Sequence, residues 1–225
     1  MTALPTFDPR QVPVAGVDAH LPRVSAPALQ SEALVQRFRS KRPWTPEIQG
    51  EPRFLQREPV HASVLIPLVQ HATGLAVLLT QRTAHLSNHS GQIAFPGGKA
   101  DPGDADAIDT ALREAEEEIG LSRHDVQVAG SLPIYTTGSA FLVTPVVGLV
   151  PSDARWTPNP HEVADVFEVP LDYLMNPAHH RRHRMEWNGA AREWFSMPYT
   201  DATAERFIWG ATAGMLRNLY RFLLD

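Results

Sequence analysis

The sequence of 225 residues contains no cysteine, which excludes disulfide bonds, thiolate zinc sites and a cysteine nucleophile. No segment approaches the roughly 20 apolar residues that a membrane-spanning helix needs, and the N-terminus lacks the pattern of a secretion signal. The net charge of −5 argues against a general DNA- or RNA-binding protein. Because 43% of the residues are hydrophobic, a globular core is expected. We therefore expect a cytoplasmic protein with neither nucleic acid nor a membrane as its partner.

The chain divides into three segments by composition. Residues 1–28 contain five prolines and little hydrophobic periodicity, which predicts an extended arm that is free to move and carries no chemistry. Residues 29–58 are expected to form a short amphipathic helix at 31–39, with Ser31 as its N-cap, and a proline-rich linker. Residues 59–225 are expected to form the main domain.

Hydrophobic patterns in the main domain predict a mixed α/β fold (α+β) without internal repeats. Strands are expected at residues 60–69, 75–82, 126–132, 141–150 and 163–169, and helices at residues 105–119 and 204–224. The strongly basic segment at 179–184, HHRRHR, is expected to be an exposed hairpin or loop, or else to meet an extra phosphate of the substrate.

The helix expected at 105–119 carries the most informative segment of the chain, which reads REAEEEIGL at residues 113–121. At 3.6 residues per turn, Glu114, Glu117 and Glu118 lie on one face of this helix. Like charges at such spacings destabilise a helix by roughly 0.2–0.5 kcal/mol per pair, so a cation is expected to offset them. Hard divalent cations take oxygen ligands and share them with substrate phosphates, which predicts phosphoryl or pyrophosphoryl chemistry. The alternative is an ordinary solvated acidic face.

Two glycines precede this helix by a short loop. Gly97 and Gly98 can bring backbone groups close to a metal ion or a phosphate. Arg113 can orient one carboxylate through a bidentate pair. Together these residues favour a functional acidic face over a solvated one.

Residues 98–121 resemble the Nudix box, whose pattern is G-x5-E-x7-R-E-U-x-E-E-x-G-U, where U is a bulky apolar residue. The second half of the pattern matches almost completely. The first half has one residue more than the pattern, Asp104 stands where the first glutamate is expected, and Ala115 replaces a bulky residue. The resemblance implies a Nudix-type α/β/α sandwich with a mixed sheet. It also implies Mg²⁺- or Mn²⁺-dependent hydrolysis of a pyrophosphate bond in a small nucleotide derivative.

A second signature lies just upstream. Residues 78–98 read LLTQRTAHLSNHSGQIAFPGG and resemble the signature L-L-T-x-R-S/A-x3-R-x3-G-x3-F-P-G-G of coenzyme A pyrophosphatase-type Nudix hydrolases. This resemblance implies hydrolysis of coenzyme A or acyl-coenzyme A to 3′,5′-ADP and 4′-phosphopantetheine or its acyl derivative. Thr83 stands where serine or alanine is expected, and Ser87 stands where the signature has arginine, a forked phosphate donor.

The departure at Ser87 keeps other substrates open, namely ADP-ribose or a dinucleoside polyphosphate. A noncatalytic nucleotide sensor built on the same fold is an alternative of another class, although all three box glutamates are present. The oligomeric state is open as well, with a homodimer among the options.

The expected metal ligands are Glu114 and Glu118, with Glu117 as third ligand or base and the carbonyl of Gly98 as a further ligand. The proton acceptor is expected to be Glu117 or Glu114, or alternatively Glu162, a loop residue that precedes a strand. The residues expected to bind substrate are Arg82, His85, Gln92, Gly97 and Lys99. Of these, Arg82 is expected to bind a phosphate or to anchor an acidic residue of the box.

Overall fold

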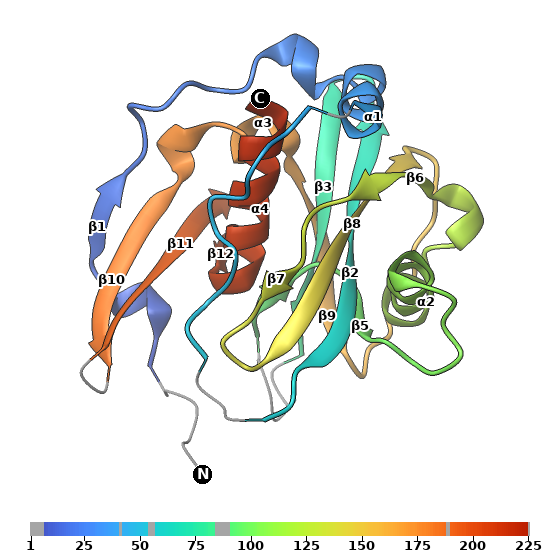
Figure 1. The fold of residues 1–225 in the computed structure, drawn as a ribbon. Coiled ribbons are helices and arrows are strands. Elements are labelled where there is room, and N and C mark those ends of the chain that lie inside the picture. The colour runs from blue at the N-terminus through green and yellow to red at the C-terminus, as the bar shows by residue number, and fades with distance from the viewer. Residues whose placement is uncertain (1–6, 41, 54–56, 84–90, 188–189, 225) are drawn as a thin grey trace.

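The structure, a computed structural model, describes residues 7–40, 42–53, 57–83, 91–187 and 190–224. Figure 1 shows the chain as stacked layers: a small sheet, helix α4, a large sheet and helix α2. Helix α4 (Gly210–Leu224) lies between the two sheets, and helix α2 (Ala107–Ile119) covers the other face of the large sheet. The glutamate-bearing helix is therefore separated from the small sheet by the large one.

The large sheet contains all the strands that the sequence predicted. Its strands are β2 (Val60–His71), β3 (Gly74–Arg82), β4 (Ile93–Ala94), β5 (Gly97–Lys99), β6 (Gln127–Ser131), β7 (Tyr135–Thr136), β8 (Phe141–Pro151) and β9 (Val163–Pro170). The main path has the order β4-β3-β2-β8-β6. Strands β2 and β8 pair in parallel, while the other pairs are antiparallel, so the expected α+β fold with a mixed sheet is confirmed.

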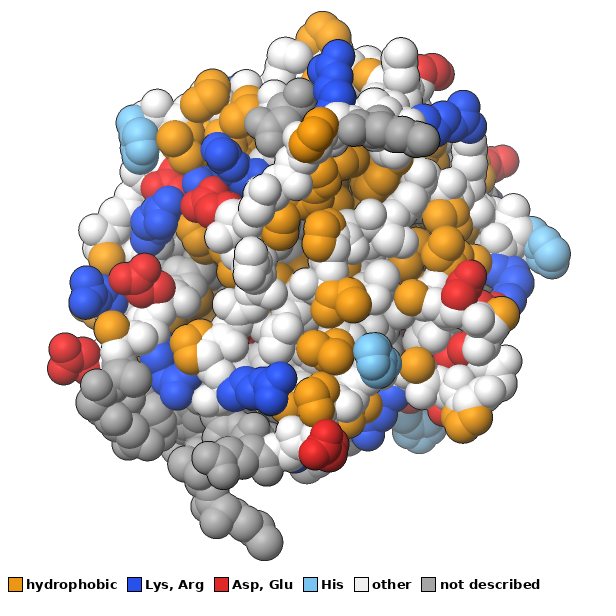
Figure 2. Space-filling model, viewed as in Figure 1, with side chains coloured by type: hydrophobic (Ala, Val, Ile, Leu, Met, Phe, Trp, Pro, Cys, Tyr) orange, Lys and Arg blue, Asp and Glu red, His pale blue; other side chains and the backbone are white. Residues whose placement is uncertain are grey.

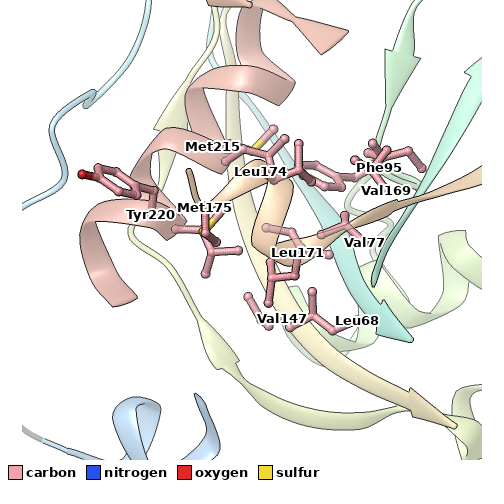
Figure 3. Packing of buried hydrophobic residues seen from close by; sticks show 14 of the residues in the cluster. Leu68, Val77, Phe95, Val147, Val169, Leu171, Leu174, Met175, Met215 and Tyr220 are labelled. Carbon is pink, nitrogen blue, oxygen red and sulfur yellow. The ribbon is translucent and has the colours of Figure 1, made fainter. Parts of the chain in front are cut away.

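Both faces of the large sheet are apolar because both are covered. On one face, Leu65 of β2 packs in a cluster with Ala115 and Ile119 of α2. On the other face, the next residue, Ile66, belongs to a larger cluster that includes Leu219 of α4. Figure 3 shows part of this larger cluster, in which side chains from the sheet, from α3 (Leu171–Leu174) and from α4 meet. A strand buried on both faces reads as a nearly continuous apolar run, which is why β2 and β8 were predictable.

Helix α2 begins two residues later than predicted, because Asp106 is its N-cap. The Asp106 side chain accepts hydrogen bonds from the amides of Ile108 and Asp109, at 2.8 and 2.9 Å. The helix ends as predicted at Gly120, which adopts the left-handed conformation at φ 66°. Helix α1 (Ser31–Arg39) also lies where it was predicted, but its N-cap is Gln30 rather than Ser31, without a side-chain hydrogen bond.

The small sheet was not predicted as a sheet. It consists of β1 (Val14–Val17), β10 (Arg181–Trp187), β11 (Ala190–Thr200) and β12 (Glu205–Trp209) in the order β1-β10-β11-β12. The prediction that the N-terminal arm is free to move is wrong for its described residues, because β1 pairs with β10. The basic segment 179–184 lies mostly in β10, which pairs with β11 as an antiparallel hairpin. The expected exposed hairpin is therefore confirmed for Arg181, Arg182 and Arg184, whereas His180 and His183 are buried.

The prediction of a single helix over residues 204–224 is wrong for its first turns. Residues 205–209 form β12, in which Phe207 and Ile208 pair with Pro198 and Met197 of β11. Both side chains are buried, so packing against the neighbouring layer overrides the helical pattern. Gly210, with φ 61°, then turns the chain into α4.

A buried ionic network fastens the N-terminal segment to α4. Arg217 of α4 is 1% exposed and contacts Asp18 (3.0 Å) and Glu47 (2.8 Å). Arg182 of β10 forms a bidentate pair with the same Asp18, at 2.7 and 2.9 Å. Arg182 is therefore engaged within the protein rather than presented to a phosphate.

Four short 3-10 helices complete the described chain: η1 (Pro9–Gln11), η2 (Ala26–Leu29), η3 (Arg123–Asp125) and η4 (Pro177–His179). On the face shown in Figure 2, acidic and basic side chains are interspersed. None of the helices in the described ranges is long and apolar enough to cross a membrane.

Candidate active site

Glu118 is the most deeply buried of the box glutamates. Its side chain is 5% exposed. One carboxylate oxygen, Oε2, accepts a hydrogen bond from the Gly97 amide at 3.1 Å, and Oε1 lies 3.3 Å from Nη1 of Arg82. Burial raises the pKa of Glu118 to about 7, because desolvation outweighs these two favourable contacts. The protein thus holds a carboxylate whose charge the site only partly compensates.

Glu114 lies one turn earlier on α2 and is pressed against the glycine turn. A methyl group added at Gly98 would lie 2.4 Å from Oε2 of Glu114, so only glycine leaves room for this carboxylate. Burial raises the pKa of Glu114 as well. The structure therefore brings together the two glutamates expected to bind metal and the two expected glycines.

Glu117 is the outermost of the three. Its side chain is 60% exposed, and Oε2 accepts a hydrogen bond from Nη1 of Arg113 at 3.1 Å. It shares that donor with Glu114, whose Oε1 lies 3.0 Å from the same nitrogen.

Arg113 is the cation that contacts the carboxylates of the acidic face. Its guanidinium forms a bidentate pair with Asp104, at 2.8 and 3.0 Å, and also donates to the Lys99 carbonyl at 3.0 Å. The Arg113 guanidinium holds the pKa of Asp104 well below its usual range. Asp104, which stands where the family pattern has glutamate, is thus the carboxylate that Arg113 orients bidentately. The sequence signalled a bidentate pair but not which carboxylate would form it.

Glu162 lies on the loop before β9, and its charge adds to burial, the main cause, in raising the pKa of both Glu114 and Glu118. The loop is joined to the last turn of α2, because the Asn159 amide donates to the Glu118 carbonyl at 2.8 Å. Glu162 is therefore close enough to act on the two glutamates expected to bind metal, although it is more than 40 residues away in sequence.

The residues expected to bind substrate have different surroundings. Arg82 contacts Glu118, so it anchors an acidic residue of the box. Gln92 lies beside it, with its carbonyl accepting from the Arg82 amide at 2.9 Å. Lys99 is exposed at the end of β5. His85 and Ser87 fall outside the described residues.

The donor set suits a hard divalent cation. Within the described ranges, no three histidine, aspartate or glutamate side chains are gathered closely enough to enclose a metal ion by themselves. Mg²⁺ is usually bound through one or two carboxylates together with water and substrate phosphates rather than by a complete protein cage. Glu114 and Glu118, whose carboxylates both lie at the Gly97–Gly98 turn, match this mode of binding.

Comparison with known proteins agrees with this site. The NUDIX domain family matches residues 59–196, which include the glycine turn, α2 and Glu162. The chain belongs to the Nudix hydrolase family. It is 42% identical over 172 residues to the uncharacterized Nudix hydrolase NudL of Yersinia enterocolitica, covering 76% of this chain and 85% of the relative. The NudL protein of Pectobacterium atrosepticum is 41% identical over 72% of this chain and 83% of its own length.

Among solved structures, the Nudix hydrolase RenU of M. smegmatis is similar to this chain, with 25% identity and a TM-score of 0.45. The similarity covers 52% of this chain and 74% of RenU. As a Nudix hydrolase, the protein is a pyrophosphohydrolase of small nucleotide substrates, and the family typically depends on divalent metal ions.

Proposed function

We propose that this Nudix hydrolase cleaves coenzyme A or acyl-coenzyme A. Water attacks a phosphorus of the pyrophosphate, the bridging P–O bond breaks, and the products are 3′,5′-ADP and 4′-phosphopantetheine or its acyl derivative. The reaction type is supported by one observation above all: Glu114 and Glu118 lie together at the Gly97–Gly98 turn. The substrate rests on the resemblance of residues 78–98 to the coenzyme A pyrophosphatase-type signature.

In this proposal Glu114 and Glu118 hold the Mg²⁺ or Mn²⁺, and Glu117 and the Gly98 carbonyl are further candidates. A bound divalent cation would neutralise charge on the phosphate oxygens and lower the pKa of water. Arg82 and the Gly97 amide orient the Glu118 carboxylate. Arg113 fixes Glu114 and, through Asp104 and the Lys99 carbonyl, ties α2 to the turn.

We place Glu162 as the proton acceptor, with Glu117 and Glu114 as the alternatives. Glu117 faces solvent and is held by Arg113, whereas Glu162 is half-buried and close to both glutamates expected to bind metal. A base that accepts a proton from the attacking water typically contributes about 10²- to 10⁴-fold to the rate. Lys99 and Gln92 border the turn and are proposed to contact the substrate.

A panel of substrates tests the proposal. Purified protein is incubated with coenzyme A, acetyl-coenzyme A, ADP-ribose and a dinucleoside polyphosphate, each with Mg²⁺ or Mn²⁺ and each with EDTA. We expect metal-dependent release of 3′,5′-ADP from the coenzyme A compounds. Cleavage of ADP-ribose or the dinucleoside polyphosphate without release of 3′,5′-ADP would replace the coenzyme A assignment with a substrate that tolerates Ser87. Nucleotide binding without cleavage of any compound would indicate a sensor.

A further inference from the structure

Thr83 holds two successive peptide groups of the loop that carries Glu162. It directly follows β3 and is 6% exposed. Its amide donates to the Glu162 carbonyl at 3.0 Å, and its hydroxyl donates to the His161 carbonyl at 3.2 Å. One buried residue therefore fixes the backbone on which the Glu162 side chain is mounted.

The other end of the same loop is fixed to α2. The amide of Thr157 donates to the Ile119 carbonyl at 2.7 Å, and that of Asn159 donates to the Glu118 carbonyl at 2.8 Å. Within the loop, the Glu162 amide donates back to the Asn159 carbonyl at 3.0 Å. Residues 157–162 thus span the gap between the end of α2 and the end of β3.

The pairing of β3 with β9 is irregular at this point. Gln81 pairs with Asp165, but the next residue, Arg82, pairs with Val163, so Ala164 is left over. A bulge of this kind bends a strand and redirects its side chains. This bulge lies beside Arg82, whose guanidinium contacts Glu118. The irregular pairing and the Thr83 contacts are therefore adjacent in the chain.

We propose that Thr83 is a positioning residue that holds the loop so that the Glu162 carboxylate faces Glu114 and Glu118. This inference rests on the proposed function, in which Glu162 accepts the proton of the attacking water. Thr83 does not touch the reacting atoms and acts only through the loop backbone. The coenzyme A pyrophosphatase-type signature has serine or alanine here, and serine retains the hydroxyl while alanine loses it.

The hydroxyl can be tested with two variants of different chemistry. Thr83→Val keeps the shape of the side chain and removes the donor, whereas Thr83→Ser keeps the donor. Because small displacements of a catalytic group are costly, we expect Thr83→Val to lower kcat on the order of 10-fold with KM changed less than about 2-fold. Thr83→Ser should stay within about 2-fold of the wild type in both. Equal kcat values for Thr83→Val and the wild type would overturn the proposal.

Tyr220→Phe is the matched control for stability. The Tyr220 hydroxyl on α4 also donates to a backbone carbonyl, that of Pro22 at 2.6 Å, in the segment that precedes α1. Its loss should lower the melting temperature about as much as Thr83→Val does, since each variant removes one hydroxyl-to-carbonyl hydrogen bond. We expect kcat to fall only in Thr83→Val. A parallel fall of kcat in both variants would mean that Thr83 acts through global stability.

A double-mutant cycle with Glu162→Gln tests whether Thr83 acts through Glu162. If it does, adding Thr83→Val to Glu162→Gln should lower kcat by less than about 2-fold further. Multiplicative effects would overturn the proposal. If Glu162→Gln alone turns over like the wild type, Glu162 is not the base, and Thr83 has no catalytic group to position.

Hydrogen exchange tests the positioning role of Thr83 independently of which substrate the enzyme cleaves. Amide exchange over residues 157–163 should be faster in Thr83→Val and unchanged in Thr83→Ser. Unchanged exchange in Thr83→Val would overturn the positioning role even if the substrate panel identifies the expected activity. Faster exchange together with no nucleotide cleavage by the wild type would instead refute the proposed function.

Discussion

The His180 imidazole accepts a hydrogen bond from Arg217 within the buried core. Nη1 of Arg217 lies 2.9 Å from Nδ1 of His180, and a guanidinium can only donate. The other ring nitrogen, Nε2, lies 2.7 Å from the Leu174 carbonyl, which can only accept. The two contacts together require a neutral ring protonated on Nε2. A second proton would have to bind Nδ1, where it would point at the positively charged guanidinium.

This contact predicts a loss of stability in mild acid. Burial, assisted by the nearby Arg217 charge, lowers the pKa of His180 from 6.5 to about 4. The unfolded chain therefore binds a proton before the folded one, so the stabilisation is complete above about pH 6.5 and is lost as the pH falls towards 4. The full loss is about 3 kcal/mol. Urea unfolding at a series of pH values measures it.

The control is His180→Gln, because an amide can accept from Arg217 and donate to the Leu174 carbonyl without titrating. Its free energy of unfolding should change less between pH 6.5 and pH 4 than that of the wild type. An equally steep change in both proteins would assign the acid sensitivity to other groups.

Glu118→Gln should abolish most of the turnover without destabilising the protein. We expect kcat to fall by on the order of 10²-fold or more, since a proposed metal ligand is removed. In the metal-free wild type, burial raises the pKa of Glu118 from 4.5 to about 7, so its charged form opposes folding. The free energy of unfolding of the wild type therefore falls as the pH rises from about 4.5 through 7. Glutamine does not titrate, so the variant avoids this loss.

At pH 8 without metal, the melting temperature of Glu118→Gln should equal or exceed that of the wild type. Differential scanning calorimetry and a steady-state assay measure the two effects. Wild-type turnover in Glu118→Gln would refute the metal assignment and the mechanism built on it.

Gly98→Ala should inactivate the enzyme by displacing Glu114. The added methyl group would lie 2.4 Å from Oε2 and 2.5 Å from Cδ of the Glu114 carboxyl group, which must move. We expect kcat to fall by on the order of 10²-fold. Gly103→Ala is the control, because its methyl group meets nothing within 4 Å. The control should stay within about 2-fold of the wild type. Similar kcat values for both variants would show that the Glu114 position is unimportant.

Arg113→Lys should lower activity although the charge is kept. An ammonium group cannot reproduce the bidentate pair with Asp104 together with the contacts to Glu114 and Glu117. We expect a loss of activity on the order of 10- to 100-fold, or a matching rise in the Mg²⁺ concentration for half-maximal rate.

Arg123→Lys is the comparison, since Arg123 binds Asp109 and Glu116 of the same helix. A metal titration of the steady-state rate distinguishes the two variants. If Arg123→Lys is impaired as strongly, the loss reflects helix stability and not the orientation of the site carboxylates.

Local sequence patterns predicted the elements whose signals are short-range. The strands of the large sheet read as apolar runs, and α2 shows an apolar stripe that ends at Gly120. The small sheet was not predicted because its strands are stabilised by pairing with segments that are distant in sequence, which a local pattern does not show. Residues 205–209 continue the helical pattern of α4 and become β12 only because β11 is beside them.

Helical spacing and glycine conformation are local properties, so the amino-acid sequence was enough to predict that three glutamates share one face of a helix next to a glycine turn. The differences between these glutamates arise from how the rest of the fold packs around them. Glu117 and Glu118 are neighbours in sequence, yet their side chains are 60% and 5% exposed. Arg82 and the Gly97 amide meet Glu118, whereas Arg113 holds Glu117 at the surface. Glu162 joins them because backbone hydrogen bonds connect its loop to both α2 and Thr83.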